Sequence, residues 1–372
     1  MLQNQIAQSV IDHGISLGAD FAELFVEKSQ TNTVSTLSNQ VQSVESGIDF
    51  GIGLRLVYGT KVLYGYTNRP EESELKRIMS ELAAKDLRNP LVPQVNFDFR
   101  KTEDIHLAIQ TLTNGSEVES KVAYLLMADT AARSASNMIS QTRGSCRQKE
   151  QFIEIFNSEG LHTEDIRNYI RTSFTAIASD GSEQATGSWN DGGLLGWEIK
   201  DALNAEKTGA EATRQALVNL GAKPCPSGRM PVVIGNGFGG VIFHEACGHL
   251  LETTQIERGT TPFSDQVGSL IAHPSVTAVD EGLSGGAFGS LSMDDEGMEP
   301  ERTVLIKDGV LQRFISDRAG ELRTGHKRTG SGRRQSHAFA AGGQGNGQRG
   351  PLPFALGLDI GCAAKAVLTG LG

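Results

Sequence analysis

Alternation of apolar and polar residues is the feature that most limits how the first 220 residues can fold. Apolar side chains occupy every second position of residues 52–56 and again of 62–66, with Gly59 and Thr60 between the two runs. Period two places such side chains on one face of a strand, and a glycine-containing pair between two runs favours a tight turn. We therefore predict a β-hairpin. Further strands are predicted at residues 22–27, 150–157 and 168–178.

Helical periodicity appears between these strands. Leu2, Ile6 and Val10 are four residues apart, which places them on one face of a helix. Helices interspersed with strands predict a mixed α+β domain over residues 1–222. Similar helical patterns cover residues 71–85, 117–134 and 205–220.

A change of composition after residue 222 marks a domain boundary. Residues 223–228, with two prolines and a glycine, cannot extend the preceding helix. We expect a short apolar strand at 231–234 and a β-hairpin at 304–311, in which a Lys-Asp-Gly segment makes the turn. Residues 223–336 are therefore predicted to form a second, β-rich domain. The glycine-rich residues 337–372 are expected to be an atypical tail.

Charge and cysteine usage limit the partners and the compartment. The formal net charge of −10 opposes binding to nucleic acid or to an anionic membrane. No secretory signal peptide or continuous transmembrane segment is visible in the sequence. Cys146, Cys225, Cys247 and Cys362 are far apart and form no CxxC motif, which predicts free thiols in a reducing, cytoplasmic compartment.

The strongest chemical signal is the HExxxH pattern formed by His244, Glu245 and His249. Two imidazoles can hold a zinc ion, and an adjacent carboxylate can act as a general base. On an ideal α-helix, however, residues five apart point about 140° away from each other. The two histidines can meet at one metal only if the helix is deformed, so we predict a single π turn, with Gly248 supplying backbone freedom.

Residues next to this pattern offer further ligands. Cys247 lies three residues after His244, and Glu252 lies three residues after His249. Cys247 is either a ligand or a small buried apolar residue, and Glu252 is either a ligand or a carboxylate outside the coordination sphere. For the whole pattern, the alternative is two structural histidines on a core helix.

Three other patterns compete with this site. Residues 235–240 spell GxGxxG, but residues 253–262 are too polar for the buried parallel strand that a dinucleotide-binding fold requires. The acidic residues 294–297 either bind a hard cation or form a tight turn. The basic loop 325–334 either holds a substrate carboxylate through its arginine pair or is solvated.

Together these residues resemble the TldD/PmbA metallopeptidases. The HEACGHLLE segment at 244–252 is similar to the signature of the TldD-like, metal-bearing branch of that family. The resemblance implies a two-domain α+β architecture with an active site that faces an internal cavity. Further similar segments lie at 21–27, 44–55, 293–297, 302–306 and 329–334.

The resemblance also implies a zinc peptidase (cofactor Zn²⁺) that hydrolyses short or unfolded peptides. His244 and His249 would bind the metal, and Glu245 would activate a zinc-bound water. The implied assembly is a pair with a PmbA-like (TldE-like) subunit, or a homodimer. The alternative is a non-catalytic subunit or interaction protein of the same fold.

The C-terminal sequence departs from this resemblance. The family's third metal ligand is a cysteine in a glycine-rich C-terminal motif, and here only Cys362 stands in a loosely similar context. Residues after Ser336 no longer resemble the family, so we expect a truncated or altered C-terminus. The third ligand is then Cys362, Cys247 or Glu252, or it is absent, in which case we expect weak zinc binding and poor cleavage.

Overall fold

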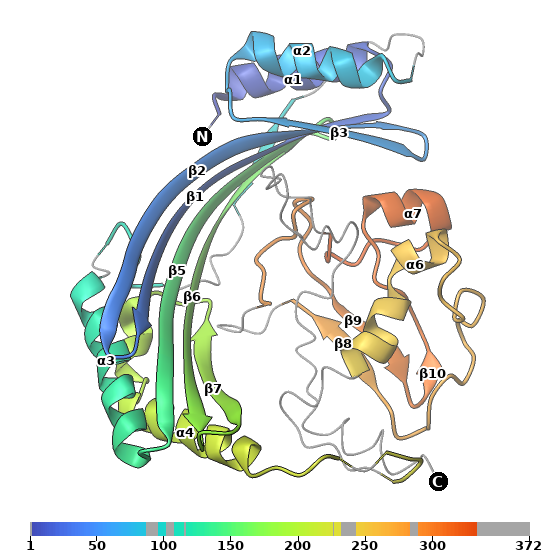
Figure 1. Cartoon of the computed structure of the whole chain (residues 1–372). Helices are drawn as coiled ribbons and strands as arrows, with labels where there is room; N and C mark the ends of the chain where they lie inside the picture. Colours follow the sequence, from blue (N-terminus) through green and yellow to red (C-terminus); the bar gives the residue numbers. More distant parts are fainter. Residues whose placement is uncertain are drawn as a thin grey trace.

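A long curved sheet dominates the N-terminal part of the chain (Figure 1). The computed structural model describes residues 2–86, 96–101, 108–114, 117–225, 227–231, 243–282 and 289–332. The strands of the sheet are β1 (Phe21–Leu37), β2 (Gln40–Tyr58), β3 (Lys61–Thr67), β4 (Asp98–Lys101), β5 (Ile139–Asn157), β6 (Leu161–Ser179) and β7 (Gln184–Gly193).

Within the described residues these strands follow the order β3-β2-β1-β5-β6-β4, and β7 also pairs with β6. β4 runs parallel to β6, whereas the other pairs are antiparallel. The predicted hairpin is confirmed as β2 and β3, with Gly59 at φ 60° in its turn. The predicted strands at 22–27, 150–157 and 168–178 are also present, as parts of β1, β5 and β6.

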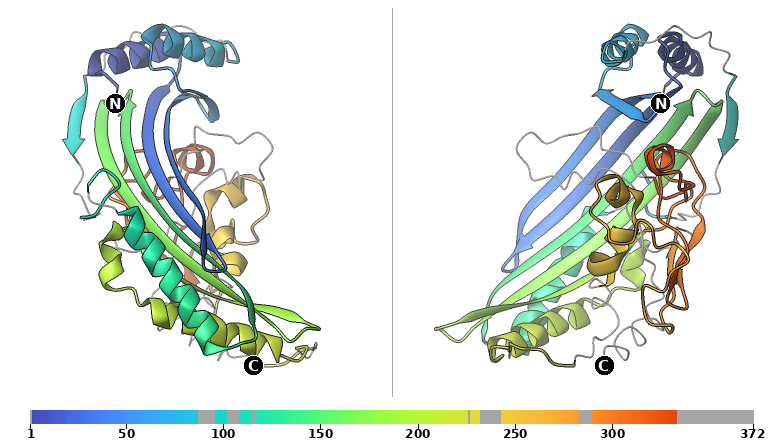
Figure 2. Two further views of the ribbon diagram at one scale, coloured as in Figure 1. Left: turned by 60° about the vertical axis from the view of Figure 1, so that its left-hand side comes forward. Right: turned by 90° about the vertical axis from the view of Figure 1, so that its right-hand side faces the viewer.

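Four helices pack on the convex face of the sheet (Figure 2). The apolar even-numbered residues of β1, such as Leu24 and Val34, point to this face and are fully buried. In the described residues no helix is both long and apolar enough to cross a bilayer. The helices, all four predicted, are α1 (Asn4–Ser16), α2 (Glu72–Ala83), α3 (Val118–Ala135) and α4 (Ala205–Leu220).

A smaller sheet lies on the concave side (Figure 1). Its antiparallel strands are β8 (Ala278–Glu281), β9 (Arg302–Lys307) and β10 (Val310–Leu311), flanked by the short helices α6 (Thr253–Glu257) and α7 (Arg318–Thr324). The predicted hairpin at 304–311 is confirmed, with Asp308 and Gly309 both in the left-handed region.

Several predicted features fall outside the described residues. Most of the expected strand at 231–234 lies there, and so does the tail from 337 to 372, which includes Cys362. Pro231, the part of that strand that is described, is not in a strand. The predicted domain limits therefore stay predictions.

Buried arginines attach the C-terminal segment to the concave face of the large sheet. Arg55 on β2 contacts Glu23 of β1 at 3.1 Å and Glu296 at 2.6 Å, and none of the three side chains is more than 10% exposed. Burial alone would lower the pKa of the Arg55 guanidinium, but Glu23 and Glu296 outweigh it and raise that pKa. The guanidinium therefore stays charged and neutralises both carboxylates inside the contact.

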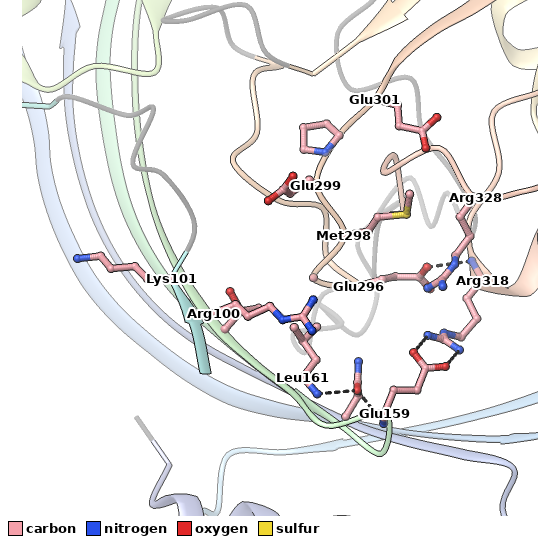
Figure 3. A pocket seen from close by; sticks show the side chains of 14 residues that line it. Arg100, Lys101, Glu159, Leu161, Glu296, Met298, Glu299, Glu301, Arg318 and Arg328 are labelled. Atoms are coloured by element: carbon pink, nitrogen blue, oxygen red, sulfur yellow. Dashed lines mark hydrogen bonds and ion pairs between the residues drawn. The ribbon is translucent and has the colours of Figure 1, made fainter. Parts of the chain in front are cut away.

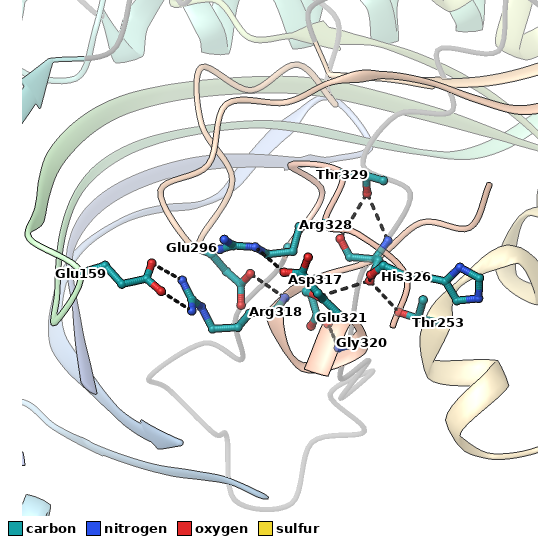
Figure 4. Close-up of polar contacts among 12 residues, drawn as sticks. Glu159, Thr253, Glu296, Asp317, Arg318, Gly320, Glu321, His326, Arg328 and Thr329 are labelled. Atoms are coloured by element: carbon teal, nitrogen blue, oxygen red, sulfur yellow. Dashed lines mark hydrogen bonds and ion pairs between the residues drawn. The ribbon is translucent and has the colours of Figure 1, made fainter. Parts of the chain in front are cut away.

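Two further arginines extend this contact. Arg167 on β6 donates to Asp295 Oδ1 and to the Met293 carbonyl oxygen, each at 2.8 Å. Arg318, in the first turn of α7, donates to both carboxylate oxygens of Glu159 at 2.8 and 2.6 Å (Figure 4). The two parallel hydrogen bonds between Arg318 and Glu159 fix the orientation of the two groups as well as pairing their charges.

The acidic segment 294–297 is a tight turn that supports these pairs. Asp294 Oδ1 accepts hydrogen bonds from the backbone N–H groups of Glu296 and Met298, and Oδ2 accepts one from Gly332. Gly297 adopts φ 73°, which glycine tolerates without strain. Of the two possibilities for this segment, the described geometry is that of the acidic turn.

We expect Arg55→Met to destabilise the chain by about 3–5 kcal/mol, because it removes the guanidinium that neutralises two buried carboxylates. Urea unfolding measures the change. The control, Arg214→Met on the exposed face of α4, should leave the unfolding midpoint almost unchanged. Equal midpoints for Arg55→Met and the unsubstituted chain would contradict the role we give to this contact.

Candidate metal centre

The backbone is deformed at the HExxxH motif. A π-helical turn, η3, spans His244–Gly248, and a 3₁₀ turn, η4, spans His249–Leu251. The His249 N–H donates to the His244 carbonyl oxygen, which is the i→i+5 bond of a π-helix. The predicted π turn is therefore confirmed.

Hydrophobic packing holds one side of this turn. Phe243 and Cys247 pack against a buried cluster from the small sheet and its neighbours. Because these two side chains face the cluster, the polar residues of the turn lie toward its other side. The cluster consists of Leu251, Val276, Ala278, Leu305, Ile306, Leu311, Phe314 and Ile315.

His244, Glu245 and His249 converge on that polar side. One ligand atom from each lies within 4.8 Å of the other two, and in the described part of the chain no other group of three such residues does so. The two imidazole centroids are 4.3 Å apart, with the rings at 75°. His249 Nε2 lies 3.9 Å from Glu245 Oε2. One small ion could contact all three side chains.

Glu252 orients the second histidine. Its Oε1 lies 2.7 Å from His249 Nδ1, and its Oε2 accepts a hydrogen bond from Thr254. The backbone at this point is fixed, since the Thr253 N–H donates to the Ile315 carbonyl oxygen at 2.9 Å. A carboxylate at Nδ1 places the proton there and leaves the Nε2 lone pair for a metal.

The electrostatics of the turn favour a neutral, ligating imidazole at His244. Burial, together with the charge of His249, lowers the pKa of His244. Metal binding requires the unprotonated imidazole, so this shift favours it. Burial raises the pKa of the Cys247 thiol to about 11, which matches its apolar packing. These two imidazoles, with a carboxylate beside them, are donors that zinc accepts.

The structure separates the ligand candidates. Glu252 hydrogen-bonds to His249, and Cys247 is outside the three-residue cluster. Cys362 lies outside the described residues, as do the GxGxxG segment 235–240 and the arginine pair of the basic loop. Nothing in the sequence marked Glu252 as the partner of Nδ1 in particular, beyond its three-residue spacing from His249.

A separate pocket of about 630 Å³ lies between β4, the β5–β6 turn and residues 296–301 (Figure 3). Its arginines are paired with acids, for example Arg318 with Glu159 and Arg328 with Glu321. None of its lining residues belongs to the histidine cluster. This pocket is part of the contact between the large sheet and the C-terminal segment.

Comparison with known proteins decides the family. Sequence models of PmbA/TldA metallopeptidases match three parts of the chain: domain 1 at residues 22–85, the central domain at 114–220 and the C-terminal domain at 227–346. A metalloprotease TldD homolog of Haemophilus influenzae is 30% identical over 344 residues, 91% of this chain and 71% of that protein. The chain belongs to the PmbA/TldD metallopeptidase family.

Other members of the PmbA/TldD family agree with this assignment. A metalloprotease TldD homolog of Buchnera aphidicola is 29% identical over 78% of this chain and 61% of that protein. A zinc metalloprotease TldD homolog of Saccharolobus solfataricus is 24% identical over 86% of this chain and 70% of that protein. The crystal structure of TldE from Thermococcus kodakarensis matches 85% of this chain and 71% of that chain, with a TM-score of 0.68 at 18% identity. This likeness confirms the expected α+β fold.

Glu252→Gln should weaken metal binding about 10–100-fold, because the charged acceptor that fixes the His249 ring is lost. Competition with a chromophoric chelator for Zn²⁺ measures the affinity without reference to activity. Cys247→Ala is the control and should retain the affinity of the unsubstituted chain. The opposite pattern, loss with Cys247→Ala and none with Glu252→Gln, would identify the thiolate as a ligand.

Proposed function

We propose that the chain is a zinc peptidase in which His244 and His249 hold the metal and Glu245 is the general base. The observation that carries this proposal is the convergence of the three side chains across the π turn. The metalloprotease names of the relatives support it, and one of them is named a zinc metalloprotease. The chain spans 71% and 61% of the first two relatives, so the activity of the whole proteins is a proposal here.

Zinc, when bound, would polarise the scissile carbonyl and lower the pKa of a coordinated water. The side chain of Glu245 is 65% exposed and its carboxylate points toward the His249 ring, 3.9 Å from Nε2. In this position it can accept a proton from the attacking water and deliver it to the leaving amine nitrogen. Glu252 keeps the His249 ring in one orientation throughout.

Short or unfolded peptides are the substrates we propose, as the family resemblance implies. The partner would be a TldE-like subunit or a second copy of the chain, and the TldE fold likeness supports this pairing. The free cysteines Cys146 and Cys247 support a reducing, cytoplasmic compartment.

One observation favours the alternative, a non-catalytic subunit of the same fold. In the described residues only Glu245 joins the two histidines, whereas a catalytic zinc uses three protein ligands. If Glu245 is the base, the third ligand must come from outside the described cluster. Cys362 is the candidate that the family resemblance suggests.

Glu245→Gln should abolish peptide hydrolysis while zinc content stays near that of the unsubstituted chain, because the amide cannot accept the proton of water. Hydrolysis of a fluorogenic unstructured peptide and elemental analysis are measured on the same sample. His244→Ala is the matched control and should lose both zinc and activity. Joint loss of zinc and activity in Glu245→Gln would make the glutamate a ligand, and an inactive unsubstituted chain that holds zinc would favour the non-catalytic alternative.

A further inference from the structure

The described residues of the C-terminal segment cover only part of the concave face of the large sheet. Phe25, Ile153 and Ile155 form a buried cluster with Met293 there. The odd-numbered positions of β5 continue on the same face beyond this cluster, since the β5–β6 register is regular from Gln141 to Phe156. Before residue 149, Arg143 and Arg147 at these positions are exposed, and Gln141 and Ser145 are half-buried.

Three exposed arginines occupy this open part. Arg143 and Arg147 lie on β5, on the same face as Ile153, and Arg147 is directly opposite Arg171 on β6. We call Arg143, Arg147 and Arg171 the arginine face. Among the described residues, none of them has a carboxylate oxygen within 4.0 Å of its guanidinium nitrogens. Arg143 donates to the Gln141 amide oxygen at 3.3 Å.

This arrangement is unfavourable without a ligand. Like charges directly opposite each other on antiparallel strands repel. The chain carries a net charge of −10, so acidic residues are available as partners, and the buried arginines Arg55 and Arg167 on the same face are paired. Because no described residue neutralises the Arg147–Arg171 pair, the pair offers a binding site for an anion.

The surroundings of the arginine face are polar. Ser145 and Ser173 lie opposite each other, between the Arg147–Arg171 pair and Arg143. Beside Arg171, a pocket of about 430 Å³ is lined also by Asn190, Asp191 and Gly192. Single-strand nucleic-acid sites combine a basic groove with several stacking aromatic side chains. The positions between these arginines hold serines, and Tyr169 is at the neighbouring position of the same face, two residues before Arg171.

We propose that the arginine face binds acidic residues of an extended peptide substrate, an inference that rests on the proposed peptidase function. Same-face side chains of an extended chain are about 6.7 Å apart. Arg143 and Arg147, two such steps apart on β5, match carboxylates at positions i and i+4 of a peptide lying along the strand. Arginine can bind each carboxylate through two parallel hydrogen bonds, and this selects acidic peptides over neutral ones.

Binding is tested apart from cleavage by using the Glu245→Gln chain and fluorescence anisotropy. The probes are a fluorescein-labelled peptide of repeated Ser-Glu pairs and its Ser-Gln counterpart. Arg147→Gln/Arg171→Gln should weaken binding of the Ser-Glu peptide about tenfold or more, since hydrogen bonds to charged groups are lost. The control Arg77→Gln/Arg214→Gln removes the same charge from exposed helix positions and should change binding less than about twofold.

Several outcomes would overturn the proposal. Equal affinity for the two peptides would do so, as would a Ser-Glu affinity that the Arg147→Gln/Arg171→Gln variant retains. Tighter, equally arginine-dependent binding of a single-stranded oligonucleotide would assign the arginine face to nucleic acid. Arginine-dependent binding of the Ser-Glu peptide, with no hydrolysis of it by the unsubstituted chain, would overturn the peptidase function and leave the anion-binding face in place.

Discussion

Neutralisation of buried guanidinium groups is the interaction on which the relation between the two parts of the chain depends. Arg55 meets Glu296 across 241 residues of sequence, and Arg167 meets Asp295 across 128. Each charge would be costly to bury alone, so each pair is stable only while the C-terminal segment lies on the sheet. The acidic turn supplies both carboxylates, and its own backbone is held by Asp294. The docked position is thereby specified by charge as well as by shape.

The metal centre is likewise held in place by contacts on both of its sides. A π turn is a less regular backbone than an α-helix. Phe243 and Cys247 pack on one side of it, and the Glu252–His249 hydrogen bond holds the other. The backbone pairing of Leu251 and Thr253 with Ile315 anchors Glu252 to the C-terminal core. Because that core is also the part docked through Glu296 and Asp295, the position of the histidines is tied to the sheet through a continuous set of contacts.

Local patterns were sufficient for part of this structure. Residues 205–220 carry a helical repeat followed by glycine, and the helix occupies those residues. The π turn followed from helix geometry, because His244 and His249 cannot otherwise converge. The sequence did not predict the full lengths of the strands. Polar residues such as Thr142 and Gln148 are buried on the convex face, where the alternating pattern leads one to expect apolar residues. The local sequence of a segment does not predict which residue of a distant segment will lie opposite it. The Arg147–Arg171 pair, which strand register sets, is an example.

The concave face shows how one set of strand positions serves two purposes. Odd-numbered residues of β5 and β6 include Arg167, which is buried with two acids, and Arg147 and Arg171, which are exposed and have no acidic partner among the described residues. Burial requires a partner within the chain, because an unpaired guanidinium in low dielectric is costly. Exposure relaxes that requirement without removing it, because water weakens the repulsion between Arg147 and Arg171 but does not cancel it. A peptide that covers this surface would exclude the water, and carboxylates on that peptide would then supply what Asp165 and Asp295 supply to Arg167.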